Sequence, residues 1–145
     1  KEIVFGNVSV IGGGLVGVET AEYLASRGCK VTIVEMMDQI AKEESNTVLP
    51  TLMEELNSHE VEVLTSAKLM EITENAVIVE KTVDEKTEKV EVASDFVVMA
   101  VGAKKNVVEL NNCTLPIHYV GDCAGERPSN IDHAIKSAYD VACEL

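Results

Sequence analysis

The sequence predicts an α/β fold: a parallel β-sheet with helices on both faces, joined to a small antiparallel β-meander. In its first part, β-branched apolar runs alternate with segments of helical periodicity, which is typical of parallel strands joined by crossover helices. A middle stretch contains only short strand-like runs separated by polar turns. A length of 145 residues allows one ordinary domain with an apolar core.

The first strand, helix and second strand are predicted at Asn7–Ile11, Leu15–Ser26 and Lys30–Glu35. Gly28 lies where a helix stop is expected. The short connection between helix and second strand requires a parallel pair with a right-handed crossover. The helix carries three larger apolar residues at core spacing: Val16, Tyr23 and Leu24.

The next helix is predicted at Ser45–Ser58, with Ser45 as its N-cap and Pro50 near its first turn. One face of this helix is apolar, through Val48, Leu49, Leu52, Met53 and Leu56. A third parallel strand follows from Val61.

The meander covers about residues 68–93, with strands at Lys68–Thr73, Ala76–Lys81 and Lys89–Val92 and turns at "TEN" and "VDEKTE". "DFVVMAVG" then reads as a buried strand that ends at a glycine. Further on, "IHYVGD" is predicted as a strand and about Ser129–Leu145 as a helix. The expected organisation is therefore a domain at residues 1–106 and a C-terminal segment at 107–145.

A glycine-rich motif follows the first strand directly. Gly12, Gly14 and Gly17 fit the spacing G-x-G-x-x-G. The first glycine permits a tight turn, the second lets a pyrophosphate approach the backbone, and the third lets the helix pack close to the sheet. Such a motif between a strand and a helix predicts a Rossmann-like dinucleotide-binding unit.

Glu35 ends the second strand, 23 positions after Gly12. That offset suits a carboxylate that accepts hydrogen bonds from the adenosine ribose. A carboxylate there repels a 2′-phosphate, and Met36 and Met37 follow it in place of an arginine. The sequence therefore favours NADH over NADPH.

Composition restricts the partners. The 25 acidic and 12 basic residues give a net charge of −13, which disfavours nucleic acid. The four cysteines show no CxxC pair, so free thiols and a cytoplasmic location are expected, with Cys29 and Cys143 as small buried side chains. No apolar run is long enough to predict a membrane span, and the three histidines lack metal-ligand spacing. The first residue, Lys1, indicates a chain cut from a longer protein.

A family resemblance covers nearly the whole chain. It rests on "VIGGGLVGVETAEYLASRG" with "VTIVEMMDQI", on "DFVVMAVGAKKN", and on "PIHYVGDCAGERPSNIDHAIKSAYDVA". These motifs resemble, in order, the pyridine-nucleotide domain of two-dinucleotide-domain flavoprotein reductases. They are most similar to the C-terminal part of the NADH:flavin oxidoreductase and 2,4-dienoyl-CoA reductase (enoate reductase-like) family. Lys105 stands before Asn106 where that family often has proline.

The resemblance implies a role for each matching residue. The three glycines of the motif, with the backbone of Leu15 and Val16, would hold the NADH pyrophosphate. Glu35 would bind the adenine-side ribose, with Met36 and Met37 beside the adenine. Glu19 would lie near the nicotinamide and flavin, against the alternative of an ordinary exposed helix glutamate. The dinucleotide would run along the strand end formed by Ala100, Val101 and Gly102.

Gly121 and Asp122 resemble the second flavin motif of the same proteins, in which the aspartate bonds the ribityl chain of FAD. Only one glycine-rich unit is present, so the resemblance implies half a flavin site, completed by the rest of a longer flavoprotein. There, hydride would pass from NADH to FAD, and electrons would then pass one at a time through an iron–sulfur cluster to FMN, both outside this chain, where an enoyl or enone substrate is reduced. No catalytic residue is expected in the chain itself, which alone would be inactive.

Two other functions stay open at this point. A regulatory NAD-sensing module would lack the meander and the Gly121–Asp122 segment, and a methyltransferase would have no use for the "A-x-G" strand end. The apolar face of the last helix, through Ile131, Ile135, Ala138 and Ala142, favours packing on another surface, in a homodimer or in the parent flavoprotein.

Overall fold

The computed structural model describes residues 4–42, 49–83, 86–107, 109–110, 112–124 and 130–145. The chain divides into two compact units, Lys1–Gly102 and Ala103–Leu145.

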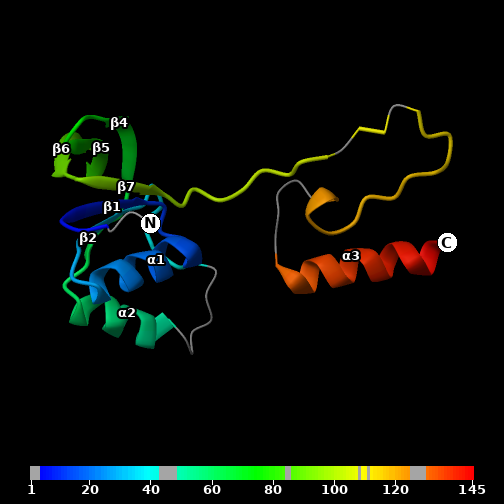
Figure 1. Cartoon of the computed structure of the whole chain (residues 1–145), viewed down its shortest axis with the longest axis horizontal. Coiled ribbons are helices and arrows are strands. Elements are labelled where there is room, and N and C mark those ends of the chain that lie inside the picture. Colours follow the sequence, from blue (N-terminus) through cyan, green and yellow to red (C-terminus); the bar gives the residue numbers. More distant parts are fainter. Residues whose placement is uncertain (1–3, 43–48, 84–85, 108, 111, 125–129) are drawn as a thin grey trace. The chain divides into compact units, whose positions relative to one another are not determined.

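Unit 1 is built on a four-stranded parallel sheet (Figure 1). Its strands are β1 (Asn7–Ile11), β2 (Lys30–Val34), β3 (Glu62–Leu64) and β7 (Phe96–Met99), in the order β3-β2-β1-β7. Val10 of the central strand β1 pairs with Ile33 of β2 on one side and with Val98 of β7 on the other. The predicted parallel arrangement of the first three strands is therefore confirmed.

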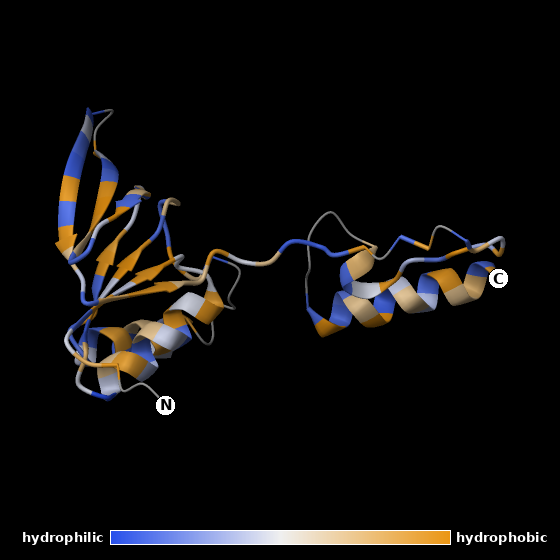
Figure 2. Ribbon diagram, turned by 45° about the horizontal axis from the view of Figure 1, so that its top comes forward, coloured by the Kyte–Doolittle hydropathy of each residue, from blue (hydrophilic) through white to orange (hydrophobic). Residues whose placement is uncertain are grey.

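Two helices, α1 (Leu15–Ser26) and α2 (Leu49–Ser58), cover one face of this sheet (Figure 1). Because side chains alternate along a strand, one residue in two reaches that face. Val8 and Val10 of β1 and Ile33 of β2 pack there with Leu52 and Leu56 of α2. The strands are largely hydrophobic along their length (Figure 2), as expected for a sheet that is covered on both faces.

The second face is covered by the antiparallel meander of β4 (Ala67–Ile72), β5 (Ala76–Val83) and β6 (Lys86–Ala93). The two layers share a second core cluster, in which Ile11, Val34 and Leu64 of the parallel strands meet Val77, Val79 and Val92 of the meander. The predicted combination of a parallel sheet, helices and an antiparallel meander is confirmed. In unit 1 the meander takes the place of helices on the second face.

Helix α1 reaches the sheet through small residues. Its buried positions are Gly17, Val18, Ala21 and Ala25. The expectation that Val16 and Tyr23 face the core is wrong, since they are 70% and 55% exposed. The contact of the helix with the glycine turn at Gly17 sets its inner face, and Val16 and Tyr23 lie on the other faces.

In α2, Leu52 and Leu56 are buried as expected. The proposed N-cap Ser45 and the apolar Val48 lie outside the described residues. The meander strands are longer than predicted, because the antiparallel pairs Lys81–Glu88 and Thr82–Thr87 extend the ladder through what was expected to be a turn.

Unit 2 contains a 3₁₀ turn at Gly121–Cys123 and helix α3 (Ile131–Glu144). The Asn130 side chain caps α3 by accepting a 3.0 Å hydrogen bond from the His133 N–H. The predicted strand "IHYVGD" is wrong: residues 117–120 form no strand and 121–123 form the 3₁₀ turn. A strand needs neighbours for its backbone groups, and the described part of unit 2 contains no other strand.

The apolar side of α3 is open to solvent within unit 2, with Ile131 76% and Ile135 63% exposed. For the same reason Cys143 is exposed, contrary to expectation, whereas Cys29 is buried in unit 1 as expected. None of the helices described has the length and apolar character needed to cross a bilayer.

Candidate functional site

The predicted nucleotide site of unit 1 lies where the parallel strands end at their carboxyl side. Directly after β1, Gly12 has a φ of +108° and donates its N–H to the Val34 carbonyl at 2.9 Å. A Cβ on Gly12 would overlap the carbonyl oxygen of Ala100, which follows β7. Both the backbone angle and the close approach therefore require glycine here.

Gly17 brings α1 against this turn. A Cβ on Gly17 would overlap the Gly12 carbonyl oxygen and lie 3.3 Å from the Ala100 side chain. This close contact with the Gly12 carbonyl supports the predicted role of Gly17 in helix–sheet packing.

Gly14 differs from its two neighbours in the motif because a Cβ there would meet nothing within 4 Å. It is the N-cap of α1, without a side-chain cap. The Val18 N–H donates to the Gly14 carbonyl at 3.0 Å, so the N–H groups of Leu15 and Val16 precede the first helical bond. An uncapped helix start with open space at its first residue fits a phosphate group of a dinucleotide.

Glu35 lies next to this loop, directly after β2, and is only 8% exposed. Its Oε2 accepts a 2.6 Å hydrogen bond from the Gly13 N–H, and its Oε1 accepts a 2.7 Å bond from the Met37 N–H. Each oxygen keeps a second acceptor site, so the carboxylate can also accept hydrogen bonds from ribose hydroxyls.

The middle glycine of the "GGG" run, Gly13, was absent from the predicted site. It is buried, and a Cβ would meet the Ile40 side chain and approach the Cβ of Glu35 to 3.0 Å. The Ala41 N–H donates to its carbonyl at 2.7 Å. The spacing motif leaves this position free, but three consecutive glycines, one more than the motif needs there, were a signal that could have identified it.

The remaining predicted residues of unit 1 border the same edge. Ala100 donates its N–H to the Ile11 carbonyl at 2.7 Å, and the chain then leaves the sheet through Val101 and Gly102, which are exposed. Met36 and Met37 are 70% and 46% exposed. Glu19 is exposed on α1 and makes no contact there that assigns it a role.

Gly121 and Asp122 belong to unit 2. The Gly121 N–H donates to Ser137 Oγ of α3 at 2.8 Å, and the Gly121 carbonyl accepts from Ala124 at 3.0 Å. Asp122 is exposed in the 3₁₀ turn. The turn is thus tied to α3, with the Asp122 side chain at the surface of the unit.

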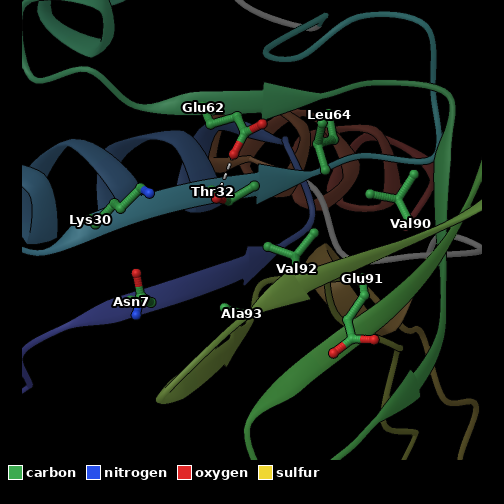
Figure 3. A pocket seen from close by; sticks show the side chains of 9 residues that line it. All are labelled: Asn7, Lys30, Thr32, Glu62, Leu64, Val90, Glu91, Val92 and Ala93. Carbon is green, nitrogen blue, oxygen red and sulfur yellow. Dashed lines mark hydrogen bonds between the residues drawn. The ribbon is translucent and has the colours of Figure 1, made fainter.

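A cleft of about 180 Å³ lies between the two sheets of unit 1 (Figure 3). Asn7, Lys30 and Glu62, which line it, are the first residues of parallel strands. Thr32 Oγ1 donates to Glu62 Oε2 at 3.2 Å across its wall. The cleft is therefore at the amino ends of the strands, whereas ligands of open α/β sheets bind beyond the carboxyl ends. None of the predicted site residues lines it.

Within the described residues, no group of three or more His, Cys, Asp or Glu side chains could hold a metal ion. All four cysteines are free, as predicted. Cys123 lies beside Asp122, and its Sγ contacts the Asn106 carbonyl at 3.7 Å.

Comparison with known proteins agrees with this geometry. A model of the pyridine nucleotide-disulphide oxidoreductase family matches residues 2–119. Bilirubin reductase of Mediterraneibacter gnavus is 45% identical over 145 aligned residues, which cover 98% of this chain and 22% of that protein. Cinnamate reductase of Clostridium sporogenes is 30% identical over 141 residues, 93% of this chain and 20% of that protein.

Among solved structures, a complex of 2-naphthoyl-CoA reductase with 2-naphthoyl-CoA is similar in fold, with a TM-score of 0.78. Its sequence is 23% identical, and the match covers 99% of this chain and 22% of that one. The chain spans about a fifth of the length of each of these three proteins.

Proposed function

The chain belongs to the pyridine nucleotide-disulphide oxidoreductase family, and we propose that within it the chain is the NADH-binding part of a flavin-dependent oxidoreductase. One observation carries this proposal. An uncapped helix start with open space at Gly14 lies beside a buried carboxylate, Glu35. These are the two groups that a dinucleotide needs, one for its phosphates and one for its ribose.

In this proposal the backbone of the glycine loop holds the pyrophosphate, and Glu35 accepts hydrogen bonds from the adenine-side ribose. The other residues border the cofactor: Met36 and Met37 at the adenine, Glu19 towards the nicotinamide, and Ala100, Val101 and Gly102 along the dinucleotide. Pyrophosphate binding uses Gly12, Gly14, Leu15, Val16 and Gly17.

NADH is favoured over NADPH because Glu35 is an acceptor-only group when ionised. A 2′-phosphate would place a second anion against this buried carboxylate, whereas ribose hydroxyls can donate to its two remaining acceptor sites. The exposed methionines that follow offer no cation to a phosphate.

The role of residues 107–145 is part of the same proposal. This segment would be the returning half of an FAD-binding domain, with Gly121 and Asp122 at the ribityl chain of FAD and the other half supplied by the rest of a longer flavoprotein. When both cofactors are bound, nicotinamide supplies hydride to the flavin, and this chain contributes binding and orientation. The chain alone would be inactive.

The substrate of the whole protein is also proposed. Similar proteins are named as reductases of bilirubin, cinnamate and 2-naphthoyl-CoA, which supports reduction of an unsaturated enoyl or enone compound. The likeness to the NADH:flavin oxidoreductase and 2,4-dienoyl-CoA reductase group would add an iron–sulfur cluster and FMN outside this chain. A cytoplasmic location, supported by the free cysteines, and homodimerisation of the chain through α3 belong to this proposal.

A regulatory NAD-sensing module without catalysis is the second candidate, because the site of unit 1 would serve it equally well. The Gly121–Asp122 turn distinguishes the two functions, since a sensor has no use for a flavin motif. If the longer protein that contains this chain binds NADH but transfers no electrons to a flavin, the result would support the sensor.

Titration of the purified protein with NADH, NADPH and S-adenosylmethionine tests the proposal directly. We expect NADH to bind most tightly. Glu35→Ala should weaken NADH binding about 10-fold or more, as expected for loss of charge-assisted hydrogen bonds. The matched control is Glu91→Ala, which removes the same charge at the far cleft and should bind NADH as the wild type does. No preference for NADH over S-adenosylmethionine would refute the proposal.

A further inference from the structure

We propose that Glu35 is a positioning residue as well as a ribose ligand: its carboxylate fixes the glycine loop in the cofactor-free protein through the Gly13 amide. This inference rests on the proposed NADH-binding function and deepens it. Ribose binding alone would not require the two hydrogen bonds that the carboxylate of Glu35 accepts from the backbone, one on each oxygen.

The two hydrogen bonds of Glu35 join segments that are 22 and 2 residues away. Its Oε2 takes the Gly13 N–H from the loop after β1, and its Oε1 takes the Met37 N–H from the segment after β2. At 2.6 and 2.7 Å both bonds are short, as charge-assisted hydrogen bonds are. The carboxylate therefore links the phosphate-binding loop to the end of the neighbouring strand.

The hydrogen bonds and close packing of Gly13 are consistent with this link. Its carbonyl accepts from the Ala41 N–H at 2.7 Å, so both backbone polar groups of the residue are bound. Ile40 and Ala41, both next to Gly13, are each 3% exposed. A side chain at position 13 would overlap Ile40 and press on the Glu35 Cβ at 3.0 Å. The close approach of loop and carboxylate thus depends on glycine at this position.

The segment that presents the carboxylate is itself anchored. Glu35 donates its N–H to the Leu64 carbonyl at 2.8 Å and accepts from the Ala67 N–H at 2.9 Å. The Met37 carbonyl accepts from the Ser66 N–H at 2.7 Å. Because these bonds tie Glu35 to the connection between β3 and β4, its carboxylate is a fixed point against which the glycine loop is held.

Loss of the carboxylate would leave the Gly13 N–H buried without its acceptor, which favours other loop conformations. A ligand then binds more weakly by the fraction of molecules whose loop remains in the binding conformation. This loss applies to any ligand that uses the loop, including one without ribose hydroxyls. That property separates a positioning role from ribose binding.

The test compares NADH with its analogue in which the adenosine ribose lacks both the 2′ and 3′ hydroxyls. Glu35→Ala removes both acceptor oxygens, so neither the Gly13 N–H nor the Met37 N–H keeps its side-chain acceptor. We expect Glu35→Ala to bind both ligands at least about 5-fold more weakly than the wild type does. Weakening of NADH alone, with the dideoxy analogue bound as by the wild type, would overturn the inference.

A second variant, Gly13→Ala, keeps the carboxylate and disturbs the packing of the loop against Ile40 and Glu35. It should weaken NADH and the dideoxy analogue by the same factor. An effect on neither ligand would contradict the positioning role.

Amide hydrogen exchange of the cofactor-free protein gives a readout that does not depend on NADH. In Glu35→Ala the amides of Gly13 and Met37 should exchange faster, while the Gly12 amide, which donates to the Val34 carbonyl, serves as the internal control. Unchanged exchange at Gly13 would refute the link. If the wild type failed to bind NADH, the proposed function would be wrong, and this exchange measurement would still decide whether Glu35 fixes the loop.

Discussion

Replacing Gly17 with alanine should destabilise unit 1, although alanine is the better helix former. In an exposed helix interior the change would stabilise by about 1 kcal/mol. Here the new methyl group would overlap the Gly12 carbonyl oxygen, which is part of a backbone that no side-chain rotation can move. Overpacking of this kind costs about 3 kcal/mol at the upper end of its usual range. The expected net loss is about 2 kcal/mol.

Urea unfolding followed by far-ultraviolet circular dichroism measures this loss, and the midpoint of thermal unfolding should fall by about 10 °C. Gly14→Ala is the matched control, because its methyl group would meet nothing within 4 Å. That variant should unfold within about 1 kcal/mol of the wild type, the difference between glycine and alanine at an N-cap. A Gly17→Ala protein as stable as the wild type, or more stable, would refute the argument that helix α1 is held against the loop by this contact.

Three further predictions concern other parts of the chain. The buried hydroxyl of Ser9, in β1, hydrogen-bonds to that of Ser94, in the connection between β6 and β7, and Ser94 also donates to the Val92 carbonyl. Ser94→Ala removes two hydrogen bonds and should cost about 2 kcal/mol in urea unfolding, whereas Ser9→Ala removes one and should cost about 1 kcal/mol; equal costs would contradict a second bond at Ser94. Met36→Arg should raise NADPH affinity about 10-fold relative to NADH in a fluorescence titration, and an unchanged ratio would place position 36 outside the ribose site. Ile135→Lys should change stability by no more than about 0.5 kcal/mol and should convert the proposed homodimer to a monomer in sedimentation; a dimer that persists in this variant would contradict an interface at α3.

The sequence predicted the elements whose pattern is local. Strand β1, helix α1 and the glycine turn between them follow from alternation, helical spacing and a motif in which each residue has a separate steric task. The prediction for Val16 and Tyr23 failed because periodicity alone ranks large apolar residues as core-facing. The close approach of α1 at Gly17 reverses that ranking, and it depends on Ala100, which is distant in the chain.

In the candidate site, too, local patterns could be predicted from the sequence and contacts between distant segments could not. Motif spacing is enough to propose the glycines and Glu35, but the hydrogen bonds that join Gly13 to Glu35 and Ala41 arise only when the loop after β1 meets the segment after β2. The failed strand at residues 117–122 has the opposite cause. Its residues have strand propensity, but a strand is stable only beside a partner, and the sequence of this segment does not reveal whether one is present.

The strict alternation along β1 has a consequence for how this chain can tolerate change. Val8 and Val10 belong to the cluster under the helices, while Ile11 belongs to the cluster under the meander. Insertion of one residue within β1 would exchange these two sets and bring the polar Ser9 to the helix side. We therefore expect insertions and deletions in β1 to destabilise the fold far more often than substitutions do, because both faces of this central strand pack against another layer.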